Sequence, residues 1–138
     1  MTSYAFLDHT ADLGIRVSGK TKKVVFQKAG LALFDLLISK KSRNKGFQKT
    51  LRVSGIDVVD LWVNWLRALL DLWTSQGRVV TNITLLSLEE SALSASLEME
   101  TFNPNEDEIN HEIKAVTYHR AEVNPTPKGW EGTVIFDL

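Results

Sequence analysis

The sequence predicts an α+β fold, in which two helices pack on one face of a mostly antiparallel or mixed β-sheet to form a single two-layer domain. Two long segments carry apolar residues at helical spacing, and several shorter segments alternate apolar and polar residues. Their order along the chain, β-β-α-β-α-β-β-β-β, is typical of this class. A chain of 138 residues has the usual length of one domain, so residues 1–138 are predicted to form one domain.

Composition excludes several kinds of site. Hydrophobic content of 43% and charged content of 24% are ordinary for a globular protein, and a net charge of −1 does not indicate a general polyanion binder. The absence of cysteine excludes disulfides, thiolate metal sites and cysteine nucleophiles, and it fits a reducing cytoplasm. No segment has 18 consecutive apolar residues or the pattern of a signal peptide. We therefore expect a cytoplasmic protein without membrane spans.

The first two predicted strands, residues 4–7 and 13–17, are separated by a polar cluster, residues 8–12. This cluster contains two carboxylates, an imidazole and a hydroxyl within five residues, so side chains can converge there on a ligand. The alternative is a turn in which Asp and Thr side chains bond to their own backbone.

Two helices are predicted. The first runs from Thr21, a suitable N-cap, to Ser39, and its apolar residues fall on one face. The second runs from Asp57, also a suitable N-cap, to Gln76, and Gly77 ends it. Its polar residues form one narrow stripe, consisting of Asp60, Asn64, Arg67, Asp71 and Thr74. Since the rest of this helix is apolar, we predict that it is nearly buried and that its three tryptophans belong to the core.

The remaining segments are predicted as strands and loops. A basic loop, residues 39–46, precedes a strand at 47–53, and an acidic loop occupies residues 103–112. Four strands are expected after the second helix, at residues 78–88, 92–102, 113–123 and 130–138. A turn at residues 125–129 joins the last two.

The end of the chain gathers negative charge. The last strand leads to Asp137 and then to Leu138, whose carboxylate adds a second charge. If this strand lies beside the one near the N-terminus, Asp12 brings a third. Unpaired carboxylates repel each other, and a hard divalent cation with oxygen ligands, calcium best of all, resolves that repulsion. The alternative is a solvent-exposed tail that needs no partner.

Other chemistries find little support. The chain has no phosphate-binding glycine-rich loop and no serine in a nucleophile-elbow context. The three histidines, His9, His111 and His119, lack the paired spacing of zinc ligands. A lone histidine in a strand is most often a hydrogen-bonded structural residue.

Three motifs together resemble the archease family. They are LDHTADLG from Leu7 to Gly14, KAVTYH from Lys114 to His119, and the terminal FDL from Phe136 to Leu138. The regions around Phe26–Phe34 and Asp60–Leu66 also resemble that family, so the similarity extends over the whole chain.

The resemblance implies a non-catalytic accessory protein that activates an RtcB-type RNA ligase in tRNA splicing, by promoting the ligase's guanylylation and turnover. It also implies a bound divalent metal, typically calcium (Ca2+), held by Asp12, Asp137 and the C-terminal residue Leu138. Lys114 matches a lysine of the family's functional cluster and is expected to contact the ligase or its nucleotide, together with His9 and His119. The ligase would be the direct partner and tRNA an indirect one, with no membrane or DNA partner.

Two other classes of function remain open. One is an RNA-binding or chaperone-like modulator of a tRNA-processing enzyme without a metal role. RNA would contact the basic loop, Lys40 to Lys45, with Lys49 and Arg52 nearby, although that loop lacks the interleaved aromatics that single-strand binding favours. The other is a hydrolase that uses His9, Asp12 and His119.

Overall fold

The structure is a computed structural model that describes residues 3–7, 12–40 and 46–138. The helices of these ranges are α1 (Lys22–Leu37) and α2 (Val58–Gln76). The strands are β1 (Ala5–Leu7), β2 (Asp12–Gly19), β3 (Ile38–Lys40), β4 (Phe47–Ser54), β5 (Arg78–Leu88), β6 (Ala92–Thr101), β7 (Asp107–Ile109), β8 (Ala115–Thr126) and β9 (Gly129–Asp137). Apart from β3 and β7, the expected elements and their order are confirmed.

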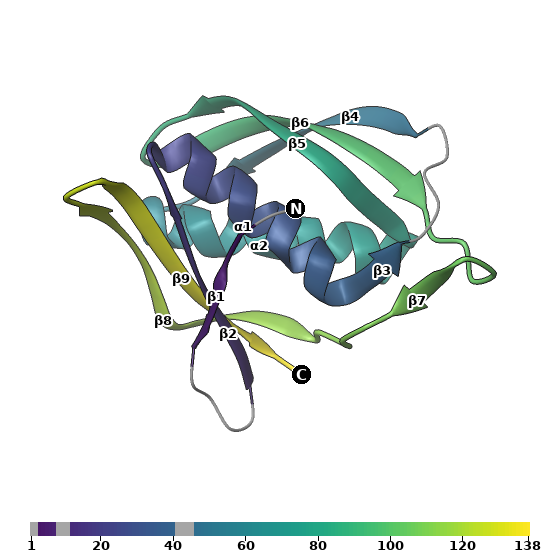
Figure 1. Ribbon diagram of the computed structural model, residues 1–138. Helices are drawn as coiled ribbons and strands as arrows, with labels where there is room; N and C mark the ends of the chain where they lie inside the picture. Colours follow the sequence, from purple (N-terminus) through teal and green to yellow (C-terminus); the bar gives the residue numbers. More distant parts are fainter. Residues whose placement is uncertain (1–2, 8–11, 41–45) are drawn as a thin grey trace.

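The two helices lie between two antiparallel sheets (Figure 1). One sheet has the strand order β1-β2-β9-β8 and the other β4-β6-β5, while β3 and β7 pair separately. Helix α1 contacts β5 on one side and β2 and β9 on the other, and α2 lies between β8 and the pair β4 and β5. The predicted α+β class and antiparallel pairing are confirmed. The prediction of one sheet with both helices on one face is wrong, because the strands form separate sheets on opposite sides of the helices.

The amount of apolar surface on α2 explains this arrangement. Its fully or nearly buried residues are Leu61, Trp62, Val63, Trp65, Leu66, Leu69, Leu70 and Leu72. A helix that is apolar around most of its circumference needs neighbours on more than one side. A single sheet covers only one side, so the second sheet and α1 complete the burial.

Local signals begin both helices, and end α2, where the sequence indicates. Thr21 caps α1 by accepting a hydrogen bond from the Val24 N–H at 3.2 Å. Asp57 caps α2 in the same way, accepting from the Asp60 N–H at 2.8 Å. Gly77 ends α2 in the left-handed conformation, with φ of 64°, which glycine adopts without the steric cost of a side chain.

The tryptophans of α2 belong to the core, as predicted. Trp62 and Trp65 are fully buried, and Trp73 is half-buried against Phe102. The indole N–H of Trp62 donates to the Thr133 carbonyl at 2.9 Å, which connects α2 to β9. The indole of Trp65 donates to a carbonyl of α1, also at 2.9 Å. Both buried indole N–H groups therefore have a partner, and each bond also joins two layers.

Strands β3 and β7 were not predicted. They pair antiparallel, with Ile38 opposite Ile109, so α1 ends at Leu37 and not at Ser39. Part of the expected acidic loop is therefore a strand. A three-residue strand carries too little alternation to be recognised in a sequence. Residues 41–45 of the basic loop lie outside the described residues.

Candidate functional site

Asp12 and Asp137 lie directly opposite each other on neighbouring strands. β2 pairs with β9 in a register that sets Asp12 against Asp137 and Leu13 against Phe136. Side chains alternate between the two faces of a strand, and Phe136 is fully buried, so Asp137 lies on the solvent face. The two aspartates therefore share that face, with Cβ atoms about 5 Å apart as in any directly opposed pair.

β8 brings Lys114 to the same strand end. The Lys114 N–H donates to the Asp137 carbonyl at 2.8 Å, and Ala115 is opposite Asp137 in the register. Residues from β2, β9 and the segment just before β8 thus meet at one end of the strands of the four-stranded sheet. Leu138 follows directly and is 45% exposed. The roles assigned to these residues stay predictions.

The chemistry of this strand end suits a hard cation. Two carboxylates on one solvent-exposed face supply the oxygen donors that calcium prefers. Across residues 3–7, 12–40 and 46–138 there is no group of three or more His, Asp or Glu side chains arranged to hold a metal. The sequence prediction takes its third ligand from the carboxylate of Leu138, and that role stays a prediction. His9 lies outside the described residues.

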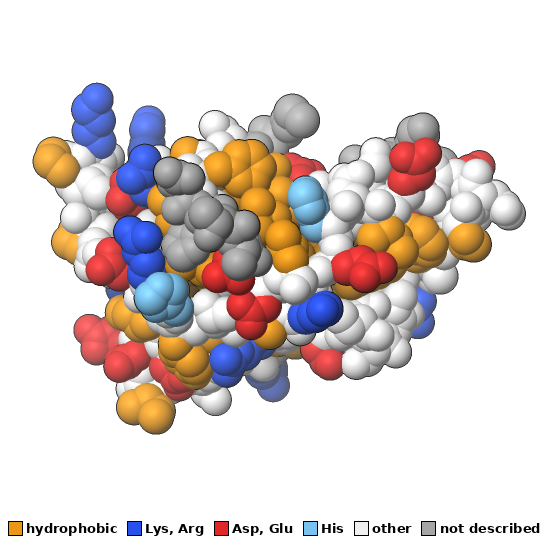
Figure 2. All heavy atoms as spheres, turned by 90° about the horizontal axis from the view of Figure 1, so that it is seen from below, with side chains coloured by type: hydrophobic (Ala, Val, Ile, Leu, Met, Phe, Trp, Pro, Cys, Tyr) orange, Lys and Arg blue, Asp and Glu red, His pale blue; other side chains and the backbone are white. Residues whose placement is uncertain are grey.

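Acidic and basic side chains are intermixed on the underside of the molecule, and histidines lie among them (Figure 2). Neither sign of charge dominates this face. The arrangement agrees with a net charge of −1 and differs from the basic stripe typical of a nucleic-acid-binding surface.

A shallow groove runs between α2 and β8. Its volume is about 260 Å3, and its lining residues are Arg67, Leu70, Asp71, Thr74, Lys114, Ala115 and Val116. We call it the α2–β8 groove. Lys114 lies at the groove and also adjoins Asp137 through its backbone, so the groove reaches the strand end that carries the aspartates.

Tyr118 joins β8 to the polar stripe of α2. Its hydroxyl donates to Asp60 Oδ1, and the Arg67 guanidinium lies 4.6 Å from the centre of its ring. Arg67 Nε also donates to the Val116 carbonyl at 3.1 Å. The hydrogen bond from Tyr118 holds the pKa of the Asp60 carboxyl below its ordinary value, with the Ile56 N–H acting in the same direction. The same bond to Asp60 raises the pKa of the Tyr118 phenol.

A bulge in β8 presents Tyr118 and the residues after it. Thr117 pairs with Ile135 but Glu122 pairs with Thr133, so residues 118–121 of β8 lie opposite a single residue of β9. His119, which is exposed, lies on this bulge. The regular strand predicted over residues 113–123 is therefore interrupted, and the strand continues to Thr126, past the start of the expected turn.

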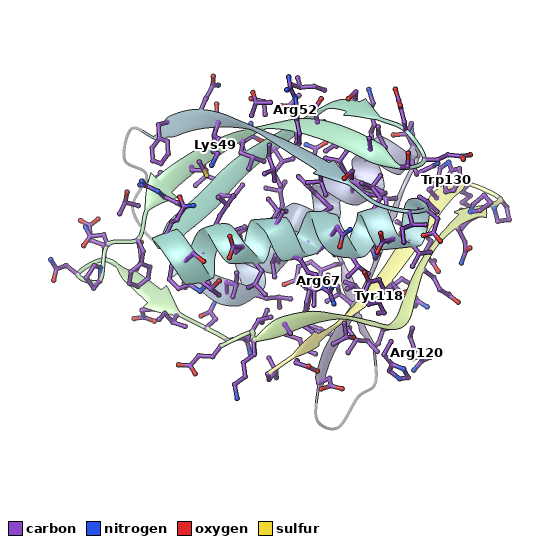
Figure 3. All side chains as sticks on the ribbon, turned by 180° about the vertical axis from the view of Figure 1, so that it is seen from behind. Lys49, Arg52, Arg67, Tyr118, Arg120 and Trp130 are labelled. Atoms are coloured by element: carbon purple, nitrogen blue, oxygen red, sulfur yellow. The ribbon has the colours of Figure 1, made fainter. Side chains whose placement is uncertain are left out.

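Lys49 and Arg52 do not join this site. Both are exposed on β4, in the other sheet, and α2 lies between them and β8 (Figure 3). Arg67, Tyr118 and Arg120 lie on the β8 side of the helix in the same view. The cations predicted to serve an RNA-binding face are therefore separated from Lys114 and the aspartates.

Sequence reasoning missed the contact of Asp60 and Arg67 with Tyr118. The polar stripe of α2 and the KAVTYH motif were both recognised, but nothing in the sequence linked them.

The described part of the chain contains no helix long and apolar enough to span a membrane. Its architecture defines a class of small α+β proteins, in which two antiparallel sheets enclose two helices and a pair of aspartates lies at one strand end. The solution structure of protein 1598 from Methanobacterium thermoautotrophicum has this fold, with a TM-score of 0.81, 25% identity and coverage of 100% of both chains. The crystal structure of a Thermotoga maritima archease, described as a possible chaperone, matches in fold alone, with a TM-score of 0.62, 20% identity and coverage of 96% and 94%.

The sequence comparisons identify the family. The model of the archease protein family (MTH1598/TM1083) matches residues 4–138. The archease of Methanosarcina barkeri is 31% identical over 139 residues, covering 98% of this chain and 95% of the relative. The archease of Pyrococcus furiosus is 30% identical over 142 residues, covering 100% of both chains. The chain belongs to the archease family, which confirms the resemblance seen in its motifs.

Proposed function

We propose that this protein is a non-catalytic accessory protein that activates an RtcB-type RNA ligase in tRNA splicing, by promoting guanylylation of the ligase and its turnover. Membership of the archease family supports the accessory role. The observation that carries the proposal is the convergence of Asp12, Lys114 and Asp137 at one strand end. The proposal places the protein in the cytoplasm, which the absence of cysteine fits.

In this proposal, Asp12, Asp137 and the carboxylate of Leu138 hold a calcium ion or a similar divalent cation. The ion neutralises carboxylates that would otherwise repel each other and orients them for a partner. Lys114 sits beside them with a flexible positive charge, which can reach a phosphate or an acidic group of the ligase. His9 and His119 are proposed to share that contact.

The metal site is tested by thermal unfolding with calcium and with a chelator. Because a ligand that binds only the native state stabilises it, calcium should raise the thermal midpoint of the wild type. Asp12→Asn should lose that rise and keep the midpoint measured in chelator. Glu90→Gln, at an exposed position of the β5–β6 turn, is the control and should respond as the wild type does. An equal response of Asp12→Asn and wild type to calcium would remove Asp12 from the ligands.

The activator role is tested by reconstitution with the organism's own RtcB-type ligase, GTP and a divalent metal. The wild type should increase the amount of covalent ligase–GMP. Lys114→Ala should lose this effect while its free energy of unfolding stays within about 1 kcal/mol of wild type, because Lys114 is exposed. Lys128→Ala, exposed in the β8–β9 turn, should activate normally. No increase in ligase–GMP with the wild type would contradict the proposed function.

A further inference from the structure

Five lysines from two distant segments lie together where the β8–β9 turn meets the start of α1 (Figure 1). They are Lys20, Lys22, Lys23, Lys28 and Lys128, and we call them the lysine patch. We infer that the lysine patch binds the phosphate backbone of RNA directly, without the ligase. The inference goes beyond the proposed function, in which RNA is reached only through the ligase, and it rests on that function only for the choice of RNA as the polyanion.

Backbone contacts hold the two segments against each other. Gly19 lies opposite Trp130 in the register of β2 and β9. A Cβ on Gly129 would lie 2.9 Å from the Lys20 Cα and would also meet the Gly19 carbonyl, so the β8–β9 turn packs directly against the link between β2 and α1. Lys22 Nζ lies 4.8 Å from the centre of the Trp130 ring. The lysines of the two segments therefore belong to one surface.

The two segments are strongly basic. From Arg16 to Phe34 the chain carries five Lys or Arg residues and no acidic one, in a protein whose net charge is −1. Residues 124–131 contain one acidic residue, Glu131, and the β5–β6 turn brings Glu89 and Glu90 to the same end of the molecule (Figure 1). Among the described residues, no ion pair joins any of these three glutamates to the lysine patch. The patch therefore keeps an excess of positive charge.

Two of the lysines occupy positions that are unfavourable for folding. Lys22 and Lys23 follow the N-cap of α1, and the first turn of this helix contains no acidic residue. The N-terminal end of a helix dipole is positive, so cations there destabilise the helix. The first turn of α2 has the expected acidic residue, Asp60. Cations that are kept at an unfavourable place, beside further cations from another segment, indicate an anionic partner.

The composition of the lysine patch favours a phosphate backbone over an acidic protein. Lysine binds phosphates as a flexible point charge, whereas it is depleted at protein interfaces. The centre of a protein interface is usually apolar, but residues 16–34 and 124–131 contain no large exposed apolar side chain. The lysines are spread over the β2–α1 link, the first two turns of α1 and the β8–β9 turn. That spread suits successive phosphates better than one small anion.

The lysine patch lies at the far end of the strand pair that carries the aspartates. Asp12 opposes Asp137 at one end of the β2–β9 pair, and Gly19 opposes Trp130 at the other. Seven residues of strand, at about 3.3 Å each, separate the two ends by about 23 Å. The protein can therefore hold RNA at the lysine patch while Lys114 and the aspartates face the ligase.

The experiment is a titration of fluorescein-labelled tRNA with this protein alone, followed by fluorescence anisotropy at about 50 and about 200 mM salt. Each phosphate contact contributes about −0.9 to the slope of log affinity against log salt. About four contacts should therefore lower the affinity about 100-fold between these two salt concentrations. In a parallel NMR titration, the indole N–H signal of Trp130 should shift, whereas the signals of the buried Trp62 and Trp65 should not.

Two variants and a matched control locate the binding. Lys23→Glu and Lys128→Glu, one from each segment, should each weaken tRNA binding by about fivefold or more and reduce the salt slope by about one. Lys49→Glu makes the same charge change at an exposed position of β4, in the other sheet. It should bind tRNA within about twofold of wild type, because distant charges are screened. Since an acidic residue suits a helix start, Lys23→Glu should unfold at no lower temperature than the wild type.

The ligase–GMP assay contains no RNA, so it tests the proposed function independently of the lysine patch. Wild-type protein that does not bind tRNA overturns the inference and leaves the proposed function standing. Lys23→Glu and Lys128→Glu proteins that bind tRNA as tightly as the wild type also overturn it. Variants that keep tRNA binding but lose calorimetric binding to the ligase would assign the patch to an acidic protein surface, which again overturns the inference. Failure of the wild type to increase ligase–GMP contradicts the proposed function alone.

Discussion

The two faces of α2 differ in what they contact. One face carries Trp62, Trp65, Leu66 and Leu69, all fully buried between α1 and the sheets. The opposite face carries the polar stripe, whose Asp60 and Arg67 meet Tyr118 of β8 near the surface. The first face supplies burial and the second supplies charge and hydrogen bonds. One helix thus separates core packing from polar contacts near the surface, and changes to one face should leave the other intact.

The largest effect should come from the buried face. Trp65→Ala should lower the free energy of unfolding by about 3–5 kcal/mol, because it leaves a cavity and removes the donor to the Phe26 carbonyl. Thr74→Ala, on the exposed face, should change it by less than about 0.5 kcal/mol. Denaturant unfolding measures both. Similar decreases in the free energy of unfolding of the two variants would contradict the conclusion that the buried face of α2 provides most of its stability.

A smaller effect, also in the core, tests how closely α1 packs against α2 and β5. A Cβ on Gly30 of α1 would lie 2.6 Å from Ile83 Cδ1, 2.8 Å from Leu69 Cδ1 and 3.3 Å from Trp65 Cζ2. Alanine favours a helix over glycine by about 1 kcal/mol, but overpacking a full core costs about 1–3 kcal/mol. We therefore expect Gly30→Ala to destabilise the protein by about 1 kcal/mol. Adding Ile83→Val should recover part of the loss, and a raised midpoint in the single variant would contradict the close packing.

The smallest effect concerns the polar stripe of α2 and should appear in the pKa values of Asp60 and Tyr118. Tyr118→Phe removes the hydrogen bond that lowers the pKa of Asp60, so that pKa should rise toward its ordinary value. Because the pKa of Asp60 is lowered in the folded protein, its carboxylate stabilises the fold at pH values above the pKa of the unfolded chain. This stabilisation is lost as the pH falls through the pKa of the folded protein. In Asp60→Asn, the pKa of Tyr118 should fall correspondingly. NMR titration of the carboxyl and phenol carbons measures both shifts.

A control separates this pair from general effects of the substitutions. Tyr4→Phe removes a hydroxyl whose pKa is raised by burial and by Asp35, and Tyr4 is not among the groups that shift the pKa of Asp60. It should leave the Asp60 titration unchanged. Unchanged titration in Tyr118→Phe as well would show that the bond between Tyr118 and Asp60 is not formed in solution.

Much of the secondary structure was determined by local signals in the sequence. The N-caps at Thr21 and Asp57, the stop at Gly77 and the polar stripe of α2 depend on neighbours within a few residues. These features were predicted correctly because helical capping and periodicity act over one or two turns. The core role of the tryptophans followed from the same periodicity.

The candidate site was predicted in part. Asp12, Lys114 and Asp137 were named from their motifs, and the pairing of the first and last long strands brings them together. The Asp60, Arg67 and Tyr118 contact was not predicted, because it depends on which edge of β8 faces α2. Such a contact joins residues far apart in the chain, and no pattern within either segment specifies it.

Tertiary structure alone decided the layers and the bulge. The sequence determined that α2 must be covered on most sides, but which sheets cover it depends on strand pairing across the whole chain. The pairing of β3 with β7 and the extra residues of β8 opposite Val134 likewise require two distant segments. The positions of helices and strands can be predicted locally because capping and periodicity involve residues a few positions apart. The pairing of strands and the order of the layers depend on burying apolar surface of the whole molecule, so no single segment specifies them.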